Sequence, residues 1–209
     1  MQTDSRAEQL VQAAEDGDAA LVTRLLAEGV PVDAYRAGGR TALDLAVRHG
    51  HGDLVRLLVD AGADPEQRAG EYGELTVLSQ AAAYSRTDIA RILLDAGAHP
   101  DTPSRIGFPL LFASSSAIPG PTCPEIVDLL LDRGADIGLR LRNLTSLEWA
   151  VWFGMVDMVH QLLRRGADPS AEALDLAEER NRHYPASRRD CERIMEALRA
   201  AGAPERMEP

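Results

Sequence analysis

Histidine and cysteine side chains, the usual metal ligands and nucleophiles, are few and scattered in this chain. The five histidines stand at positions 49, 51, 99, 160 and 183, and the two cysteines at positions 123 and 191. Only His49 and His51 are close together, and a zinc site needs further ligands that no neighbouring cysteine supplies. We therefore expect no metal site, and two free thiols in a reducing compartment.

Signatures of catalysis are missing from the sequence as well. There is no G-x-S-x-G nucleophile elbow, no phosphate-binding G-x-x-x-x-G-K-[ST] loop and no dinucleotide-binding glycine pattern. We therefore expect no catalytic residue and no cofactor. The alternative is a groove holding His49, Tyr84, Asp44 and Glu148, which could perform acid and base chemistry on a small molecule.

The composition favours helices and argues against two classes of partner. Hydrophobic residues make up 45% of the 209 residues and aromatic ones only 4%, which suits helices packed through aliphatic side chains. The net charge of −11 repels phosphate backbones and anionic lipids, so we expect neither nucleic acid nor a membrane as partner. The polar start of the chain and its unpaired cysteines predict a cytoplasmic protein, and the use of arginine for all 22 basic residues points to a bacterial genome.

Two phrases recur along the chain in a fixed order. The first reads LLAEG at 25–29, LLVDAGAD at 57–64, LLDAGAH at 93–99, LLDRGAD at 130–136, LLRRGAD at 162–168 and LRAAGA at 198–203. Its marker glycines, 33, 35, 37, 32 and 36 residues apart, are Gly29, Gly62, Gly97, Gly134, Gly166 and Gly202. The second phrase reads TALDLA at 41–46, TVLSQA at 76–81, FPLLFA at 108–113 and TSLEWA at 145–150. The two phrases together indicate about six structural repeats.

The second phrase resembles the T-P-L-H-x-A signature of the ankyrin repeat, whose period is about 33 residues. The resemblance extends from about Ala7 to Ala203 and implies an all-α, ankyrin-repeat solenoid of helix-turn-helix repeats with finger loops. It implies a single domain over residues 1–209, with repeats at about 5–33, 38–66, 73–101, 107–137, 143–169 and 171–204. The histidine of the signature is absent, replaced by Asp44, Ser79, Leu111, Glu148 and Asp175.

Local chemistry predicts the same helices. Thr41 and Thr145 are good N-cap residues, and Asp44 and Glu148 stand three places later, where they could complete capping boxes. An apolar i, i+1, i+4, i+5 pattern, first seen at 54–59, forms one stripe on each second helix. Each marker glycine is expected just past the end of that helix, with a positive φ. One repeat cannot bury two helices alone, so the repeats must stack.

Three insertions interrupt the period. A stretch rich in Pro, Ser and Gly over 114–125 predicts a surface loop, and a polar run over 181–190 predicts a loop or a prolonged helix. The connection over 64–76 is four residues longer than that over 33–41, which predicts an extended finger. Binding sites are often found in such insertions.

In proteins with the ankyrin pattern, finger tips and the exposed positions of the first helices form a concave face, and the register predicts which residues lie there. The predicted contact residues are Arg48, His49, Tyr84, Ser115, Ser116, Trp152 and Phe153 on the first helices, and Tyr35, Arg40, Tyr72, Arg105 and Arg142 on the fingers. Trp152 and Phe153 are expected to be anchors, whereas Trp149 is expected in the core and His51 is expected to bond the neighbouring turn. The alternatives are that Phe153 covers the last repeat and that each arginine is solvated surface charge.

These observations predict a non-catalytic module, an adaptor, an inhibitor or an immunity-type protein, that binds a protein partner through the concave face. We expect a monomer, and the acidity of the chain allows a basic partner, whose complex would weaken with salt. The alternative is a small-molecule-binding protein or an atypical enzyme that uses the same groove. A deep pocket with convergent polar groups would favour that alternative.

Overall fold

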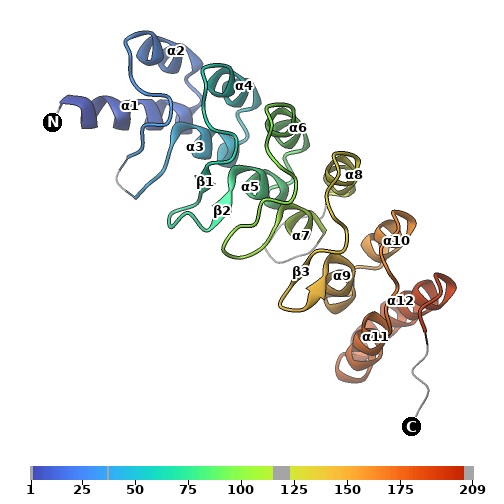
Figure 1. Ribbon diagram of the computed structural model, residues 1–209. Coiled ribbons are helices and arrows are strands. Elements are labelled where there is room, and N and C mark those ends of the chain that lie inside the picture. The colour runs from blue at the N-terminus through green and yellow to red at the C-terminus, as the bar shows by residue number, and fades with distance from the viewer. Residues whose placement is uncertain (1, 37, 115–122, 205–209) are drawn as a thin grey trace. The chain divides into compact units, whose positions relative to one another are not determined.

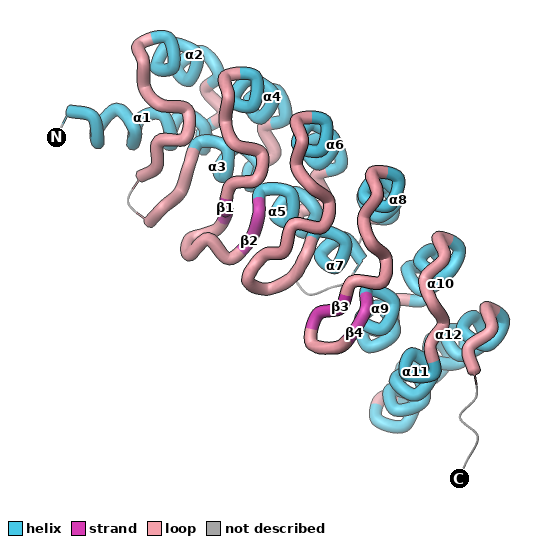
Figure 2. Tube along the Cα trace, viewed as in Figure 1, coloured by secondary structure: helices cyan, strands magenta, loops and turns pink. Residues whose placement is uncertain are grey.

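The computed structural model describes residues 2–36, 38–114 and 123–204. Within these residues the chain forms twelve α-helices, one short 3-10 helix and four two-residue strands, so the predicted helical fold is confirmed. The chain divides into two compact units, residues 1–109 and 110–209. In each unit a first helix, a turn, a second helix and a loop follow one another and then repeat (Figure 1, Figure 2). None of the described helices is long and apolar enough to span a bilayer.

The first unit contains three helix pairs. They are α1 (Gln2–Asp16) with α2 (Ala19–Ala27), α3 (Ala42–His49) with α4 (Gly52–Asp60), and α5 (Val77–Ala83) with α6 (Thr87–Asp95). The first helices α1, α3 and α5 pack in one row, and the second helices α2, α4 and α6 pack in another (Figure 1). The loops that follow α2, α4 and α6 are called here the first, second and third fingers, residues 30–41, 63–76 and 98–108. Strands β1 (Arg68–Ala69) and β2 (Leu75–Thr76) make the second finger an antiparallel hairpin.

The second unit begins within α7 (Pro109–Ser114). It continues with α8 (Pro124–Asp132), β3 (Arg140–Leu141), β4 (Leu144–Thr145), α9 (Ser146–Phe153), α10 (Val156–Arg164), α11 (Ala171–His183), a 3-10 turn (Pro185–Ser187) and α12 (Arg188–Ala200). β3 and β4 pair antiparallel within the fourth finger, residues 135–145. α9 and α10 pack against α11 and α12, respectively. The insertion over 181–190 prolongs the first helix, because α11 has 13 residues and α9 has 8.

Apolar stripes along the helices form the core of each unit. In the first unit Leu54, Val55 and Leu58 of α4 are at most 2% exposed, and in the second unit Val159 and Leu162 of α10 are fully buried. These residues occupy the predicted i, i+1, i+4, i+5 positions. The apolar stripes of each helix pair are buried against the neighbouring pair, so the stability of a repeat depends on stacking.

Glycines end the helices at two kinds of position. The six marker glycines follow the second helices with φ between 85° and 100°, which confirms the predicted left-handed ends. Gly154 ends the first helix α9 with φ 73°, and a Cβ there would lie 2.6 Å from Nη2 of Arg180 in the next repeat. Gly17 faces His51 in the same manner, and Nε2 of His51 lies 3.0 Å from the carbonyl oxygen of Glu15, so His51 has the predicted structural role.

Threonine N-caps begin α3 and α9, as predicted. Oγ1 of Thr41 accepts a hydrogen bond from the Asp44 amide over 3.1 Å, and Oγ1 of Thr145 accepts one from the Glu148 amide over 3.3 Å. Glu148 also completes the predicted capping box, since its Oε2 accepts from the Thr145 amide over 2.7 Å. Asp44 does not complete the second predicted box, because its carboxylate turns instead to the guanidinium of Arg40.

Candidate partner-binding surfaces

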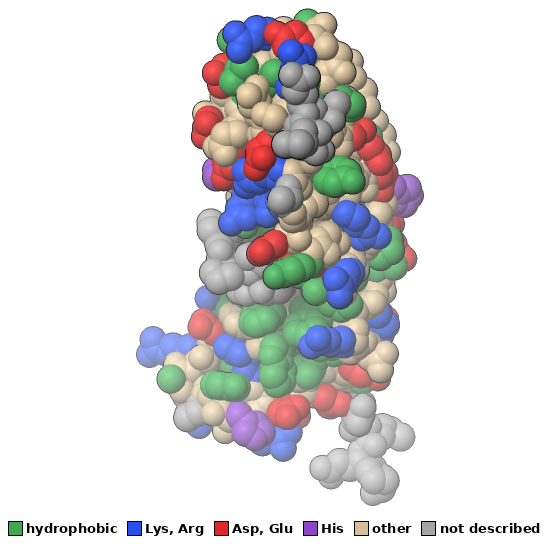
Figure 3. Space-filling model, turned by 90° about the vertical axis from the view of Figure 1, so that its left-hand side faces the viewer, with side chains coloured by type: hydrophobic (Ala, Val, Ile, Leu, Met, Phe, Trp, Pro, Cys, Tyr) green, Lys and Arg blue, Asp and Glu red, His purple; other side chains and the backbone are tan. Residues whose placement is uncertain are grey.

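Large exposed hydrophobic side chains lie on the fingers and at the carboxyl ends of first helices. Three of them, Tyr35, Tyr72 and Ile106, project from the first, second and third fingers. The other three, Tyr84, Trp152 and Tyr184, lie at the carboxyl ends of the first helices α5, α9 and α11. The described parts of the second helices carry none. Figure 3 shows hydrophobic side chains among basic ones on the face turned toward the viewer.

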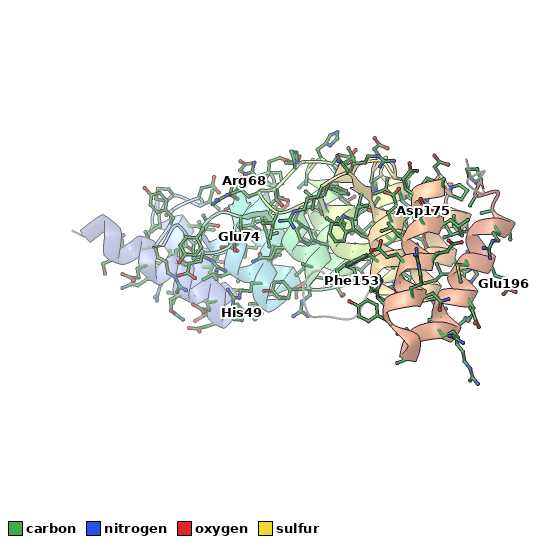
Figure 4. The ribbon with its side chains drawn as sticks, turned by 90° about the horizontal axis from the view of Figure 1, so that it is seen from below. His49, Arg68, Glu74, Phe153, Asp175 and Glu196 are labelled. Atoms are coloured by element: carbon green, nitrogen blue, oxygen red, sulfur yellow. The ribbon has the colours of Figure 1, made fainter. Side chains whose placement is uncertain are left out.

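The second and third fingers are tied together at their tips. Nη1 of Arg68 donates to the carbonyl oxygen of Pro103 over 3.0 Å, and the Arg105 amide donates to the carbonyl oxygen of Glu74 over the same distance. Between them lies a hollow of about 590 Å³ lined by Tyr72, Glu74, Arg105 and Ile106. Figure 4 shows Arg68 toward the finger edge of the first unit and His49 toward the opposite edge. The predicted contact residues Tyr72 and Arg105 therefore share one surface.

Arg40 does not lie on the exposed part of its finger, in contrast to its prediction as a contact residue. Its side chain is 8% exposed and forms an ion pair with the Asp44 carboxylate, which is 1% exposed. Oδ1 of Asp44 also accepts a hydrogen bond from the Gly70 amide over 3.4 Å, so the Arg40–Asp44 ion pair is bonded to the backbone of the second finger. Burial raises the pKa of Asp44 above its ordinary value, against the opposing effects of the Arg40 charge and hydrogen bonds from Gln80 and Gly70. Arg40 is thus a structural residue in the first unit.

The carboxyl end of α3 presents Arg48 and His49 to solvent, as predicted. The ring of His49 stacks on that of His51, with centroids 6.1 Å apart, and its Nε2 lies 3.8 Å from Oε1 of Glu15. Nη1 of Arg36 forms an ion pair with Oε2 of the same glutamate over 2.8 Å. Within the described residues, no three His, Cys, Asp or Glu side chains are grouped so as to hold a metal ion. The cluster is therefore a network of imidazole and guanidinium groups around one carboxylate.

In the second unit, the three aromatic residues of α9 have different environments. Trp149, which was expected in the core, is only half-buried. Its ring stacks on that of Phe153, with centroids 5.9 Å apart, and its Nε1 donates to the Leu141 carbonyl oxygen over 3.4 Å. Phe153 is also half-buried, whereas Trp152 is 38% exposed. Trp152 is therefore the more accessible of the two predicted anchors.

Trp152 lies beside a hollow of about 170 Å³, whose other lining residues are Glu179, Arg180, His183 and Tyr184. Nη1 of Arg180 donates to the Trp152 carbonyl oxygen, and its guanidinium lies 5.2 Å from the centre of the Tyr184 ring. These contacts hold the end of α11 against the end of α9.

Arg142 lies at the tip of the fourth finger, where it was predicted. It has a φ of 52° and the next residue, Asn143, a φ of 64°, so both residues of the two-residue hairpin loop adopt the left-handed region. The side chain of Arg142 is exposed, as are those of Tyr35 and Tyr84. The predicted contact residues Ser115 and Ser116 lie outside the described residues.

Two of the acid and base groups considered for catalysis are buried. Asp44 and Glu148 are each 1% exposed and serve the backbone of their own repeats. Oε1 of Glu148 accepts from Oγ of Ser170 over 2.9 Å, while its Oε2 completes the cap of α9. Neither carboxylate is open to a substrate.

Two exposed hydrophobic residues were missed by the sequence reasoning, namely Ile106 and Tyr184. Both stand in irregular segments, where the repeat register assigns no position. The one available signal was a large apolar side chain inside a polar insertion, which for Tyr184 is the run over 181–190.

Comparison with known proteins agrees with this architecture. Residues 10–104 match the family model described as ankyrin repeats (3 copies). The chain is 42% identical over 65 residues to the inactive serine/threonine-protein kinase TEX14 of Mus musculus and 41% identical over 68 residues to that of Bos taurus. These matches cover 31% and 32% of this chain but only 4% and 5% of those relatives.

Among solved structures, the human ASB11 ankyrin repeat domain is similar in fold. Its TM-score is 0.76 at 22% sequence identity, and the match covers 95% of this chain and 86% of that one. The likeness therefore extends well past the residues that the family model matches.

Proposed function

This chain is an ankyrin repeat protein, and from that premise we propose that it is a non-catalytic module that binds a protein partner through its finger tips and the exposed ends of its first helices. The ankyrin repeat fold is a general protein–protein interaction module. The proposed surface corresponds to the concave face of the ankyrin pattern, and the proposed role is that of an adaptor, an inhibitor or an immunity-type protein acting in the cytoplasm as a monomer.

The distribution of exposed hydrophobic side chains carries this proposal. Six large hydrophobic residues are exposed in the described chain, and all six lie on fingers or at the ends of first helices. Tyr and Trp supply large contact areas at low cost in conformational entropy and are enriched in interfaces, as is Arg. Exposed large hydrophobic side chains that gather on particular segments are typical of interaction sites, because covering their apolar surface with a partner is more favourable than leaving it in water.

The environments of the candidate acid and base groups support binding over the alternative of catalysis on a small molecule. Of the four residues proposed for acid and base chemistry, Asp44 and Glu148 are buried in the supports of their fingers and helices. The hollow beside Trp152, about 170 Å³, is smaller than the roughly 300–1,000 Å³ typical of small-molecule sites. The hollow between the second and third fingers, about 590 Å³, falls within that range, but its lining residues Tyr72, Arg105 and Ile106 are exposed on the finger tips. The hollow beside Trp152 is large enough for one side chain of a partner.

Affinity capture with the tagged full chain tests the proposal. A partner retained by the unmodified protein should be lost by the double variant Tyr84→Ala, Trp152→Ala, because both rings are exposed and the proposal assigns each of them a contact with the partner. The matched control is the double variant Arg91→Ala, His160→Ala, which removes exposed side chains from the second helices α6 and α10 and should retain the partner. Equal retention by both variants would remove this surface from the binding role.

A further inference from the structure

Residues 180–189 form a basic segment in an acidic chain. The sequence RNRHYPASRR contains four arginines and no acidic residue, although the chain as a whole carries a net charge of −11. The segment covers the end of α11, the 3-10 turn and the beginning of α12. It belongs to the insertion that sets the last repeat apart from the others.

Three of these arginines are available to a partner. Arg182, Arg188 and Arg189 are exposed, and within the described residues they form no ion pair; the Nε atom of Arg182 contacts only the Glu178 carbonyl oxygen, at 3.4 Å. The nearest acidic residues in sequence, Glu179 and Asp190, stand one at each end of the segment, and Glu179 also lines the hollow beside Trp152. Figure 3 shows basic, histidine and hydrophobic side chains together at the end of the molecule that α11 and α12 form, with acidic ones beside them.

Arg188 and Arg189 also stand where a helix disfavours positive charge. They are the first two residues of the 13-residue helix α12, next to the positive end of its dipole. The N-cap residue Ser187 makes no side-chain capping hydrogen bond, so the amide groups of the first turn are not satisfied by it. An anion placed here would interact with both the arginines and the positive end of the helix dipole.

An apolar anchor point lies beside this charge. The hollow next to Trp152 is lined by the rings of Trp152 and Tyr184 and opens at the end of α11, where the basic segment begins. Arg180 contacts both sides of the hollow, through the backbone carbonyl oxygen of Trp152 and the face of the Tyr184 ring. One side chain of a partner could therefore enter the hollow while its neighbours meet the arginines.

We propose that this surface binds an acidic protein segment in which carboxylate side chains flank one aromatic or aliphatic side chain. The proposal rests on the protein-binding role above and names the chemistry of the partner. It differs from the basic partner that the net charge suggests. At physiological ionic strength, charges more than about 8 Å away are screened, so the arginines close to the binding site determine which charge the partner carries. The large hydrophobic side chain would fill the hollow, and the carboxylates would pair with Arg182, Arg188 and Arg189.

Fluorescence anisotropy with defined peptides tests this inference on the full chain. The probe is a labelled peptide with glutamates on both sides of one phenylalanine. Its dissociation constant should rise about tenfold or more in the double variant Arg188→Glu, Arg189→Glu. The double variant Arg56→Glu, Arg91→Glu changes the net charge equally, but on α4 and α6, and should shift binding by no more than about twofold. Trp152→Ala should weaken the phenylalanine peptide and leave an alanine version of the same peptide unchanged.

Four results would overturn the inference. The two charge variants could lose affinity for the peptide equally, or a peptide with lysines in place of glutamates could bind as tightly as the original. Single-stranded oligouridylate could bind more tightly than the peptide, or the peptide could fail to bind at about 1 mM. Far-UV circular dichroism of each variant separates these results from unfolding. If captured partner still depends on Tyr84 and Trp152 while the peptides fail, the general binding role stands and only the acidic ligand is removed.

Discussion

At the scale of single residues, the same residue type has opposite roles according to its burial. Arg40 and Arg105 both stand on fingers, yet Arg40 neutralises a buried carboxylate and Arg105 faces solvent beside Ile106. A buried ion pair is no evidence of stability by itself, because removing two charges from water costs about as much as their attraction returns. Removing one partner, however, leaves an uncompensated charge in the interior.

We expect Arg40→Met to destabilise the fold by about 3–5 kcal/mol at neutral pH, because it leaves the Asp44 carboxylate buried without its cation. The Arg40 charge lowers the pKa of Asp44, so its loss raises that pKa further. A carboxyl group whose pKa is higher in the folded state than in the unfolded state binds more protons when folded. The free energy of unfolding therefore falls as the pH rises from the unfolded-state pKa through the folded-state pKa, and it recovers on acidification. Urea unfolding should therefore show the loss shrinking as the pH is lowered toward 4.

The double variant Arg40→Met, Asp44→Asn, which keeps a side-chain oxygen as acceptor for the Gly70 amide, is the control for this prediction. It removes both charges and should recover much of the lost stability at neutral pH. A loss in Arg40→Met that did not change with pH would show that packing around the side chain, and not the unpaired carboxylate, is responsible.

At the scale of elements, a side chain of the next repeat contacts the carboxyl ends of the first helices α1 and α9. Arg180 donates to the carbonyl oxygen of Trp152 at the end of α9, and His51 lies against Gly17 after α1. Glycine is needed at both helix ends for two reasons: its backbone φ is positive, and a side chain of the next repeat occupies the position that a Cβ would take. Helix ends and stacking are thus coupled.

Gly154→Ala should consequently cost more stability than Gly166→Ala. Both positions have positive φ, which costs an alanine about 1–2 kcal/mol. A Cβ at Gly166 meets no atom within 4 Å, whereas one at Gly154 displaces the Arg180 guanidinium and adds about 1 kcal/mol for the lost hydrogen bond. The free energies of unfolding of the two variants in urea measure the difference, and equal losses would mean that Arg180 contributes nothing to this helix end.

Much of this architecture could be predicted from the sequence, because the repeat phrases contain local signals. The Thr145–Glu148 box and the six left-handed marker glycines depend only on residues within one helix end. The environment of Asp44 could not be predicted, since it depends on the finger that packs over it from the next repeat. Exposure of Tyr184 depends on how α11 ends, and the insertion that sets this end has no counterpart in the other repeats.

At the scale of the whole molecule, the two compact units make the effects of a core lesion local. Leu162 is fully buried in α10, and Leu58 is fully buried in α4. Each truncation to alanine should cost about 2–5 kcal/mol. The stability of a repeat protein is approximately the sum of the stabilities of its repeats and of the interfaces between neighbouring repeats. Leu162→Ala should therefore lower amide hydrogen-exchange protection in α9–α12 and leave α3–α6 nearly unchanged. Leu58→Ala should do the reverse. Equal loss of protection along the chain in either variant would mean that residues 1–109 and 110–209 unfold as one cooperative body, and the binding surfaces of the two units could then not be altered independently.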